Sequence, residues 1–200
     1  MSIDPVSTDR ISRRNLGTLF VGAAASFTLS GLPFDARAQT TPAPAPLNLD
    51  VPYVPTPQEV VDKMLSLAQV RDGDYLIDLG CGDGRIPVTA AQRFNIRAYG
   101  VDIDPKRITE AREKAKEAGV TDKVVFEEKN LFDTNLSDAT VLTLYLLPRI
   151  NLELRPRILS ELKPGTRVVS HAFDMGDWAP DQFEKVNGRN VYLWTVPARA

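Results

Sequence analysis

The chain has 200 residues, of which 43% are hydrophobic, so its length suits one globular domain with an appended segment. It has 24 Lys and Arg against 26 Asp and Glu, and this formal charge of −2 argues against nucleic acid or an anionic membrane as a partner. Its single cysteine excludes an intramolecular disulfide.

The first 38 residues are typical of an export signal. Arg13 and Arg14 precede an uncharged stretch over 15–34, and Ala36 and Ala38 are small residues of the kind that a signal peptidase recognises. The run 12–16 (Ser-Arg-Arg-Asn-Leu) resembles the twin-arginine signal, which implies the twin-arginine translocase as a partner. A membrane anchor is the alternative, but a span needs about 20 strongly apolar residues, and this stretch is rich in Gly, Ser and Thr.

We therefore expect a signal peptide over 1–38, cleaved near Ala38, with no stable transmembrane span afterwards. The expected location is the periplasm, or the membrane if the signal remains attached, and the cytoplasm is the alternative.

Prolines mark a linker before the folded domain. Six prolines between residues 39 and 57 exclude a helix or a central strand, so we expect a linker over 39–51 and the domain over 52–200. Thr56, Pro57 and Glu59 form the pattern of a capping box with proline at the first helical position, which predicts a helix start there.

Beyond the linker, predicted helices and strands alternate. Helices are predicted over 57–69, 84–94, from Asp104 to Gly119, and over 149–162 with a break or kink at Pro156. Strands are predicted over 75–78, 97–101, 124–126, 139–146 and 166–172. Two last strands, 183–186 and 191–196, flank Asn187-Gly188, a strong hairpin signal. This order predicts an α/β fold with a mainly parallel sheet covered by helices on both faces.

A glycine-rich turn follows the first predicted strand. Gly80, Gly82 and Gly84 have no Cβ, so the backbone can turn sharply and approach a ligand closely, and the helix that follows offers free N–H groups. Asp102 ends the next strand, 24 residues after Asp78, where its carboxylate can accept hydrogen bonds from both hydroxyls of a ribose. The turn and the acid together predict a nucleoside cofactor.

The spacing of the glycines distinguishes between cofactors. The dinucleotide pattern G-x-G-x-x-G is not met, because residue 85 is arginine, and the phosphate-binding pattern G-x-x-x-x-G-K-[ST] is absent. Gly-x-Gly-x-Gly after an acid resembles motif I of the class I S-adenosylmethionine-dependent methyltransferases. Their fold is a Rossmann-like sheet of seven strands that ends in an antiparallel hairpin. Here the helix usually found between the fifth and sixth strands is not predicted.

The resemblance implies S-adenosylmethionine as the cofactor and assigns residues to its parts. Gly80 and Gly82 would line the methionine part, and Asp78 would help to hold its ammonium group. Asp102 would bind the ribose, and Ile103 would pack on the adenine.

Five further residues complete the implied cofactor site. Asn130, followed by Leu131, stands where many members have an Asp that accepts a hydrogen bond from the adenine amino group. An Asn carbonyl can accept the same bond, and a surface turn is the alternative. Tyr53 and Thr56 are expected to fold back over the cofactor, with linker docking as the alternative. Cys81 belongs to the same set, as a small packing residue within the turn.

Three segments indicate a narrower group. Residues 51–56 (Val-Pro-Tyr-Val-Pro-Thr), 78–86 and 143–148 (Thr-Leu-Tyr-Leu-Leu-Pro) resemble a bacterial subgroup related to the protein-lysine methyltransferases that include the one acting on the ATP synthase c-subunit. The resemblance covers about 51–180 and implies a protein lysine as the methyl acceptor. The alternatives are methylation of a small molecule or lipid, and a protein that binds the S-adenosyl ligand without catalysis.

Two candidate catalytic residues lie near the predicted ends of strands. Tyr145 stands where amine methyltransferases have an acceptor motif, although the Asn/Asp-Pro-Pro-aromatic signature is absent; its ring could orient the amine or face the sulfonium. Its alternative role is that of a buried strand aromatic. His171, the only histidine, could relay a proton, with a structural role as the alternative. The loop that follows could form a wall of the acceptor pocket with Phe173, Asp174 and Trp178.

Overall fold

The computed structural model describes residues 53–199, so the predicted export signal over 1–38 and the linker over 39–51 lie outside the described residues. The helices are α1 (Gln58–Leu67), α2 (Arg85–Phe94), α3 (Pro105–Glu117) and α4 (Pro148–Glu161), with a 3-10 turn η1 (Leu131–Asp133). The strands are β1 (Tyr75–Leu79), β2 (Arg97–Asp102), β3 (Val124–Glu128), β4 (Val141–Leu144), β5 (Arg167–His171), β6 (Gln182–Val186) and β7 (Arg189–Thr195). Over 53–199 no helix has the length and apolar character needed to cross a bilayer.

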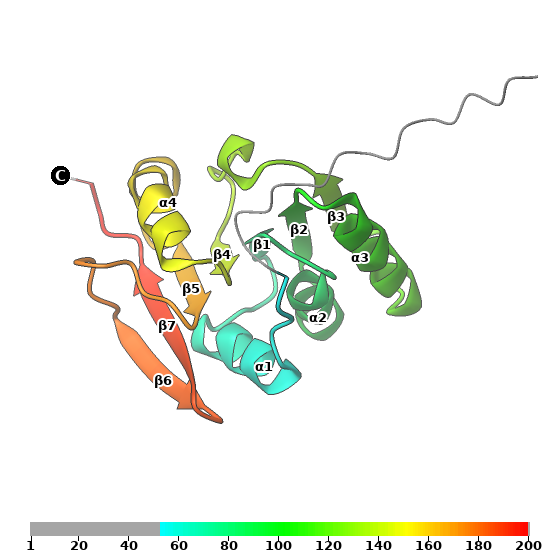
Figure 1. Ribbon diagram of the computed structural model, residues 1–200, viewed down its shortest axis with the longest axis horizontal. Helices are drawn as coiled ribbons and strands as arrows, with labels where there is room; N and C mark the ends of the chain where they lie inside the picture. The colour runs from blue at the N-terminus through cyan, green and yellow to red at the C-terminus, as the bar shows by residue number, and fades with distance from the viewer. Residues whose placement is uncertain (1–52, 200) are drawn as a thin grey trace, which may run out of the picture. The chain divides into compact units, whose positions relative to one another are not determined.

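All seven strands form one sheet in the order β3-β2-β1-β4-β5-β7-β6 (Figure 1). The first five are parallel, whereas β7 runs antiparallel to both β5 and β6. The predicted fold class, a mainly parallel sheet that ends in an antiparallel hairpin, is therefore confirmed. The chain order reverses between β1 and β4, and ligands of such sheets bind at the carboxyl ends of the strands on either side of this reversal.

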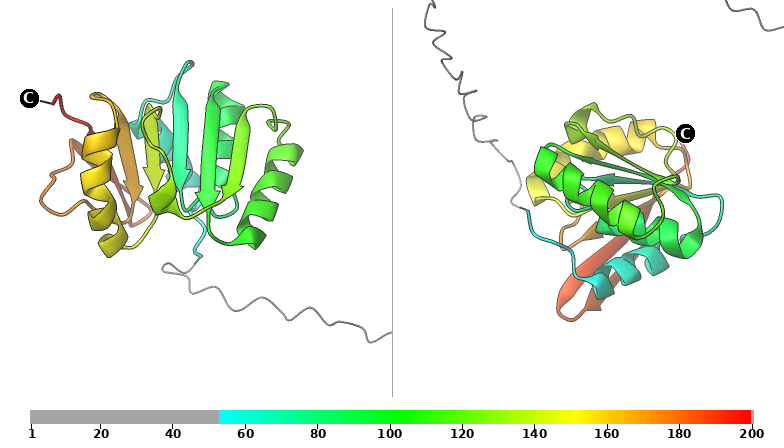
Figure 2. Two further views of the ribbon diagram at one scale, coloured as in Figure 1. Left: turned by 90° about the horizontal axis from the view of Figure 1, so that it is seen from above. Right: turned by 90° about the vertical axis from the view of Figure 1, so that its right-hand side faces the viewer.

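Helices cover both faces of the sheet and give it two cores (Figures 1 and 2). On one face α1, α2 and α3 bury apolar side chains against strand residues such as Leu76 and Phe126. On the other face α4 packs against residues such as Ile77 and Leu142. Leu76 and Ile77 are neighbours and enter different cores because successive side chains of a strand point to opposite faces. The parallel strands are thus apolar on both sides.

The hairpin and the loop before it match the sequence prediction. Asn187 and Gly188 have φ angles of 48° and 81°, and a two-residue type I′ turn requires positive φ at both positions. No helix lies between β5 and β6, where residues 172–181 form a loop.

Two local predictions are wrong, and a third is wrong in one of its two alternatives. Pro57 is the N-cap of α1 and no side chain caps this helix, because the hydroxyl of Thr56 hydrogen-bonds to Nδ1 of His171 at 3.2 Å. Strand β4 ends at Leu144, so Tyr145 follows the strand and does not belong to it. Helix α4 continues through Pro156, so the break predicted there is absent, whereas the alternative, a kink, stays a prediction. Pro156 has no N–H to donate to the carbonyl of Leu152, a residue that is itself exposed.

Gly84, the N-cap of α2, tests how closely α2 and α3 pack against the sheet. Gly84 has a φ of +73°, and a Cβ there would lie 2.5 Å from Cζ of Phe126 and 2.8 Å from Cβ of Ala111. Gly119 has a similar φ of +67°, but a Cβ there would meet nothing within 4 Å. We expect Gly119→Ala to cost about 1–2 kcal/mol from backbone strain alone. Gly84→Ala should cost about 1–3 kcal/mol more from overpacking. Urea unfolding measures both, and equal losses for the two variants would contradict this packing.

Candidate active site

One pocket opens at the carboxyl ends of β1, β2 and β4, the edge toward which the arrowheads of the parallel strands point in the left view of Figure 2. Its walls come from the 53–56 segment, the turn between β1 and α2, the loop after β2, the region around η1, and the residues that follow β4 and β5. All the predicted cofactor-binding residues and Tyr145 line it, whereas His171 does not: Tyr53, Thr56, Asp78, Gly80, Cys81, Gly82, Asp102, Ile103, Asn130, Leu131 and Tyr145.

The three glycines of the turn have two different roles. Gly80 and Gly82 have positive φ angles and face the pocket, where a Cβ would lie 2.8 Å from Leu146 and 2.5 Å from the ring of Tyr53, respectively. Gly84 faces the core and permits close packing of α2. The turn is fixed to the neighbouring strand, because the backbone N–H groups of Gly80 and Cys81 both donate to the carbonyl of Val101 at 2.9 Å.

Asp102 is held in place by the backbone. Its Oδ2 accepts a hydrogen bond from the N–H of Gly82 at 2.9 Å, and its Oδ1 accepts one from the N–H of Asp104 at 3.0 Å. A carboxylate offers about four acceptor positions, so each oxygen keeps about one for a ligand. Asp102 therefore presents two fixed acceptors to the pocket.

Asp78 is the buried acid of the site. It is 2% exposed, and its Oδ1 accepts a hydrogen bond from the hydroxyl of Thr143 at 2.7 Å. Burial raises the pKa of Asp78 to about 7; the Thr143 bond opposes this rise, and the charges of Asp102 and Asp83 add to it. A cation beside this carboxyl would stabilise its charged form.

The part of the pocket formed by the loop after β2 and by η1 has an apolar rim. Ile103 is 43% exposed and lines the pocket together with Leu131 and Phe132. Oδ1 of Asn130 accepts a hydrogen bond from the N–H of Phe132 at 3.0 Å and so caps η1. The turn alternative for Asn130 is therefore present in the structure, and one lone pair of its oxygen is left for a ligand.

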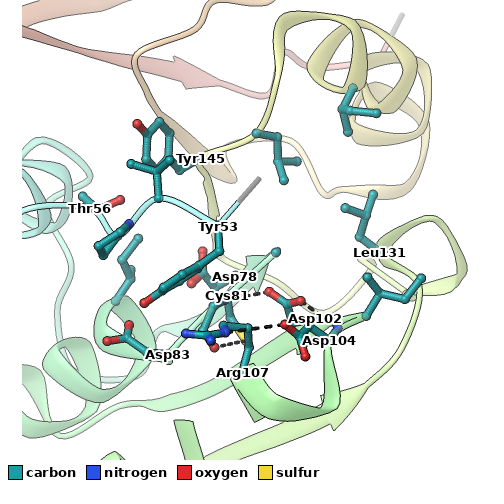
Figure 3. Close-up of a pocket in the computed structure, with 18 of the residues that line it drawn as sticks. Tyr53, Thr56, Asp78, Cys81, Asp83, Asp102, Asp104, Arg107, Leu131 and Tyr145 are labelled. Carbon is teal, nitrogen blue, oxygen red and sulfur yellow. Dashed lines mark hydrogen bonds and ion pairs between the residues drawn. The ribbon is translucent and has the colours of Figure 1, made fainter. Parts of the chain in front are cut away.

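Charged residues that the sequence analysis did not select hold the 53–56 segment over the turn. Arg85 donates to the carbonyl of Thr56 at 2.8 Å, and the guanidinium carbon of Arg107 lies 4.2 Å from the centre of the Tyr53 ring. Figure 3 shows Tyr53 next to Arg107. Arg85 lies inside the glycine motif, where its own segment could have drawn attention to it. Arg107 carries no sequence signal, because only the fold brings it to Tyr53.

Asp83 forms ion pairs with Arg85 and with Lys114. Its carboxylate accepts hydrogen bonds from Arg85 and from Lys114, each as close as 2.7 Å. Burial by itself would raise the pKa of Asp83, but the two cations outweigh it and hold the pKa at about 2. The charge of Arg85 is therefore neutralised before any ligand enters.

Tyr145 lies against two other aromatic rings. Its ring centre is 3.8 Å from that of His171 and 6.5 Å from that of Phe173. Phe173 lines the pocket, as predicted, whereas Asp174 and Trp178 do not. Trp178 instead packs on Trp194, with ring centres 5.9 Å apart.

His171 is 1% exposed and lies outside the pocket. Burial, with the positive charge of Arg189 in addition, lowers the pKa of His171 to about 4, so the ring is neutral near pH 7. A base this weak suits the structural role better than the predicted proton relay.

Known proteins are similar to this chain in sequence. Residues 78–182 match the family described as ANTKMT methyltransferase domain. A protein-lysine N-methyltransferase of Saccharolobus islandicus is 47% identical over 151 residues, which are 73% of this chain and 94% of that protein. The ATP synthase c-subunit lysine N-methyltransferase of Rattus norvegicus is 29% identical over 176 residues, 87% of this chain and 78% of that protein.

A solved structure has a similar fold and contains a bound nucleoside ligand. The crystal structure of an RNA methyltransferase from Salinibacter ruber in complex with S-adenosyl-L-homocysteine is 53% identical, with a TM-score of 0.72 over 74% of this chain and 96% of that one. The resemblance to class I methyltransferases, the subgroup and the S-adenosylmethionine cofactor predicted from the sequence are thereby confirmed. This chain belongs to the ANTKMT methyltransferase domain family and is an S-adenosylmethionine-dependent methyltransferase.

Proposed function

We propose that the enzyme methylates the ε-amine of a protein lysine, with cofactor and amine in adjoining halves of the pocket. The observation that carries the proposal is the apolar half, which Tyr145, Leu146, Leu147, Ile150 and Phe173 line directly beside the glycine turn. Such walls suit an aliphatic side chain that ends in an amine. The name of the Saccharolobus islandicus relative supports the same acceptor.

The residues of the other half fit S-adenosylmethionine. The two free acceptor positions of Asp102 match the two ribose hydroxyls, and the buried carboxyl of Asp78 matches an ammonium group. Ile103 and Leu131 offer apolar contacts to adenine, and the remaining lone pair of Asn130 can accept from its amino group. The cofactor supplies a methyl group on a positively charged sulfur, so the protein's main task is to align it with the amine.

The apolar half also favours the neutral form of the lysine amine, which is the form that can accept a methyl group. A lysine with a pKa of about 10.4 is neutral in roughly one of 10³ molecules near pH 7.4, which costs about 4 kcal/mol. Desolvation against the apolar residues of this half, Tyr145 and Phe173 among them, would lower the amine pKa and so reduce this cost. The Tyr145 ring can also face a cation.

Acceptor identity can be tested with tritium-labelled S-adenosylmethionine and a cell lysate. We expect label in protein, lost on protease digestion and recovered as methyllysine after hydrolysis. Label removed by ribonuclease would favour RNA, as in the name of the Salinibacter ruber protein, and label in the lipid phase would favour a lipid; either result contradicts the lysine proposal.

The pocket cations Arg85, Arg107 and Lys129 each lie within 4 Å of a carboxylate, which argues against a phosphate-binding surface.

Asp102→Ala tests the ribose contact. Hydrogen bonds to a charged group contribute about 1.5–3 kcal/mol each, so loss of the carboxylate should weaken S-adenosylhomocysteine binding at least about tenfold by calorimetry. Glu128→Gln is the matched control, because Glu128 pairs with Asp102 in the sheet register but is exposed and lies outside the pocket. Unchanged affinity in Asp102→Ala would refute the assignment.

Cofactor binding should depend on pH through Asp78. Well above pH 7 the carboxyl is already charged and the affinity for S-adenosylhomocysteine should be constant. Below pH 7 the carboxyl must release a proton before it can hold the ammonium group, so the affinity should fall by up to about tenfold per pH unit. In Asp78→Asn this slope should disappear. Calorimetry from pH 5.5 to 8.5 measures the slope, and a flat profile in the parent protein would contradict the role of Asp78.

We also propose that residues 1–38 direct the protein through the twin-arginine translocase to the periplasm or hold it at the membrane. That route carries folded proteins, so the cofactor could cross already bound, although further turnover would need a new supply. Changing Arg13 and Arg14 to Lys should retain the protein in the cytoplasm. Cell fractionation with mass spectrometry of the N-terminus measures this, and full-length parent protein in the cytosol would argue against export.

A further inference from the structure

We propose that Thr56 and His171 are positioning residues that couple the 53–56 segment, which lies over the cofactor half, to the Tyr145 ring in the acceptor half. The inference rests on the proposed function only in treating the Tyr145 side as the acceptor half. It assigns His171 a role that needs no proton transfer.

The first part of the connection is Thr56, which is held at two points. Its carbonyl accepts the hydrogen bond from Arg85 at 2.8 Å, and its hydroxyl hydrogen-bonds to Nδ1 of His171 at 3.2 Å. Thr56 is 4% exposed, and its neighbour Tyr53 covers Gly82. The hydroxyl therefore reaches His171 only while the segment lies over the turn.

The second part is the contact between His171 and Tyr145. The ring centres lie 3.8 Å apart at an angle of 34°. Tyr145 is the first residue after β4, and its side chain contacts the rings of His171 and Phe173, so these contacts help to set how the ring faces the pocket. A shift of His171 would therefore move the side chain that we assign to the amine.

A strained turn supports this role. Ala172 has a φ of 70°, and the N–H of Phe173 donates to the carbonyl of His171 at 2.9 Å, which makes a γ-turn of the rare, unfavourable type. The turn places His171 and Phe173 against the same ring, that of Tyr145. Asn151, which is fully buried, donates to the carbonyl of Phe173 at 3.3 Å and helps to hold the turn. Backbone strain of this kind is concentrated at functional sites.

Hydrogen exchange with and without S-adenosylhomocysteine tests the coupling in the full-length protein without a methyl acceptor. In the parent we expect the ligand to protect residues 53–57, 143–147 and 171–174. Thr56→Val and His171→Phe should each reduce the protection gained over 143–147 by about two- to tenfold, the range for one neutral hydrogen bond. The double variant should lose no more than either single variant, because both remove the same connection.

Two controls separate positioning from a general loss of stability. Thr166→Val also removes a hydroxyl that is 4% exposed, one that donates to the carbonyl of Ala139 at 3.1 Å, and it should keep the parent response. Thr56→Ser keeps the hydroxyl and should restore the response, which decides the question even if His171→Phe does not fold.

The proposal is overturned if Thr56→Val responds as the parent does, if the two effects add, or if bound ligand gives the parent no protection over 143–147. Label in RNA or lipid would contradict the lysine acceptor but leave these outcomes unchanged, so the two failures are distinguishable.

Discussion

The site depends on three hydrogen bonds that hold the β1–α2 turn against the end of β2. Two N–H groups, of Gly80 and Cys81, donate to the carbonyl of Val101, and the N–H of Gly82 donates to Asp102. Glycine suits both positions because Gly80 and Gly82 have positive φ angles, which L side chains rarely adopt, and because a Cβ would crowd Leu146 or Tyr53. The three bonds hold the turn and Asp102 in a fixed relation to each other. The 53–56 segment and the residues around Tyr145 complete the pocket around them.

Features that depend on neighbouring residues in the sequence were predicted correctly. Alternating apolar segments predicted the sheet, Asn187-Gly188 predicted the hairpin, and Asp104 predicted the cap of α3, where its side chain accepts from Lys106. Prediction failed where a tertiary contact competes with a local one. The capping box at Thr56 is the clearest case, because the hydroxyl bonds to a residue 115 positions away instead of the start of α1. The contact between Arg107 and Tyr53 had no local signal for the same reason.

On the side of the pocket that Tyr145 lines, a turn and an aromatic ring stand where other class I methyltransferases usually have a helix. With no helix between β5 and β6, the strained turn at Ala172 and the ring of Phe173 supply a wall of the pocket. That wall is apolar, and the nearby cations are paired with carboxylates; both observations support the proposed amine acceptor over a phosphate chain. Two similar proteins bear different names, one for lysine and one for RNA, so membership of the family does not by itself decide the acceptor.

The most direct test of this account is a crystal structure of the protein with S-adenosylhomocysteine. The account predicts both ribose hydroxyls within hydrogen-bond distance of Asp102, adenine against Ile103, and the sulfur directed toward the side of the pocket that Tyr145 lines. A nucleoside bound elsewhere, or one with its ribose away from Asp102, would contradict it.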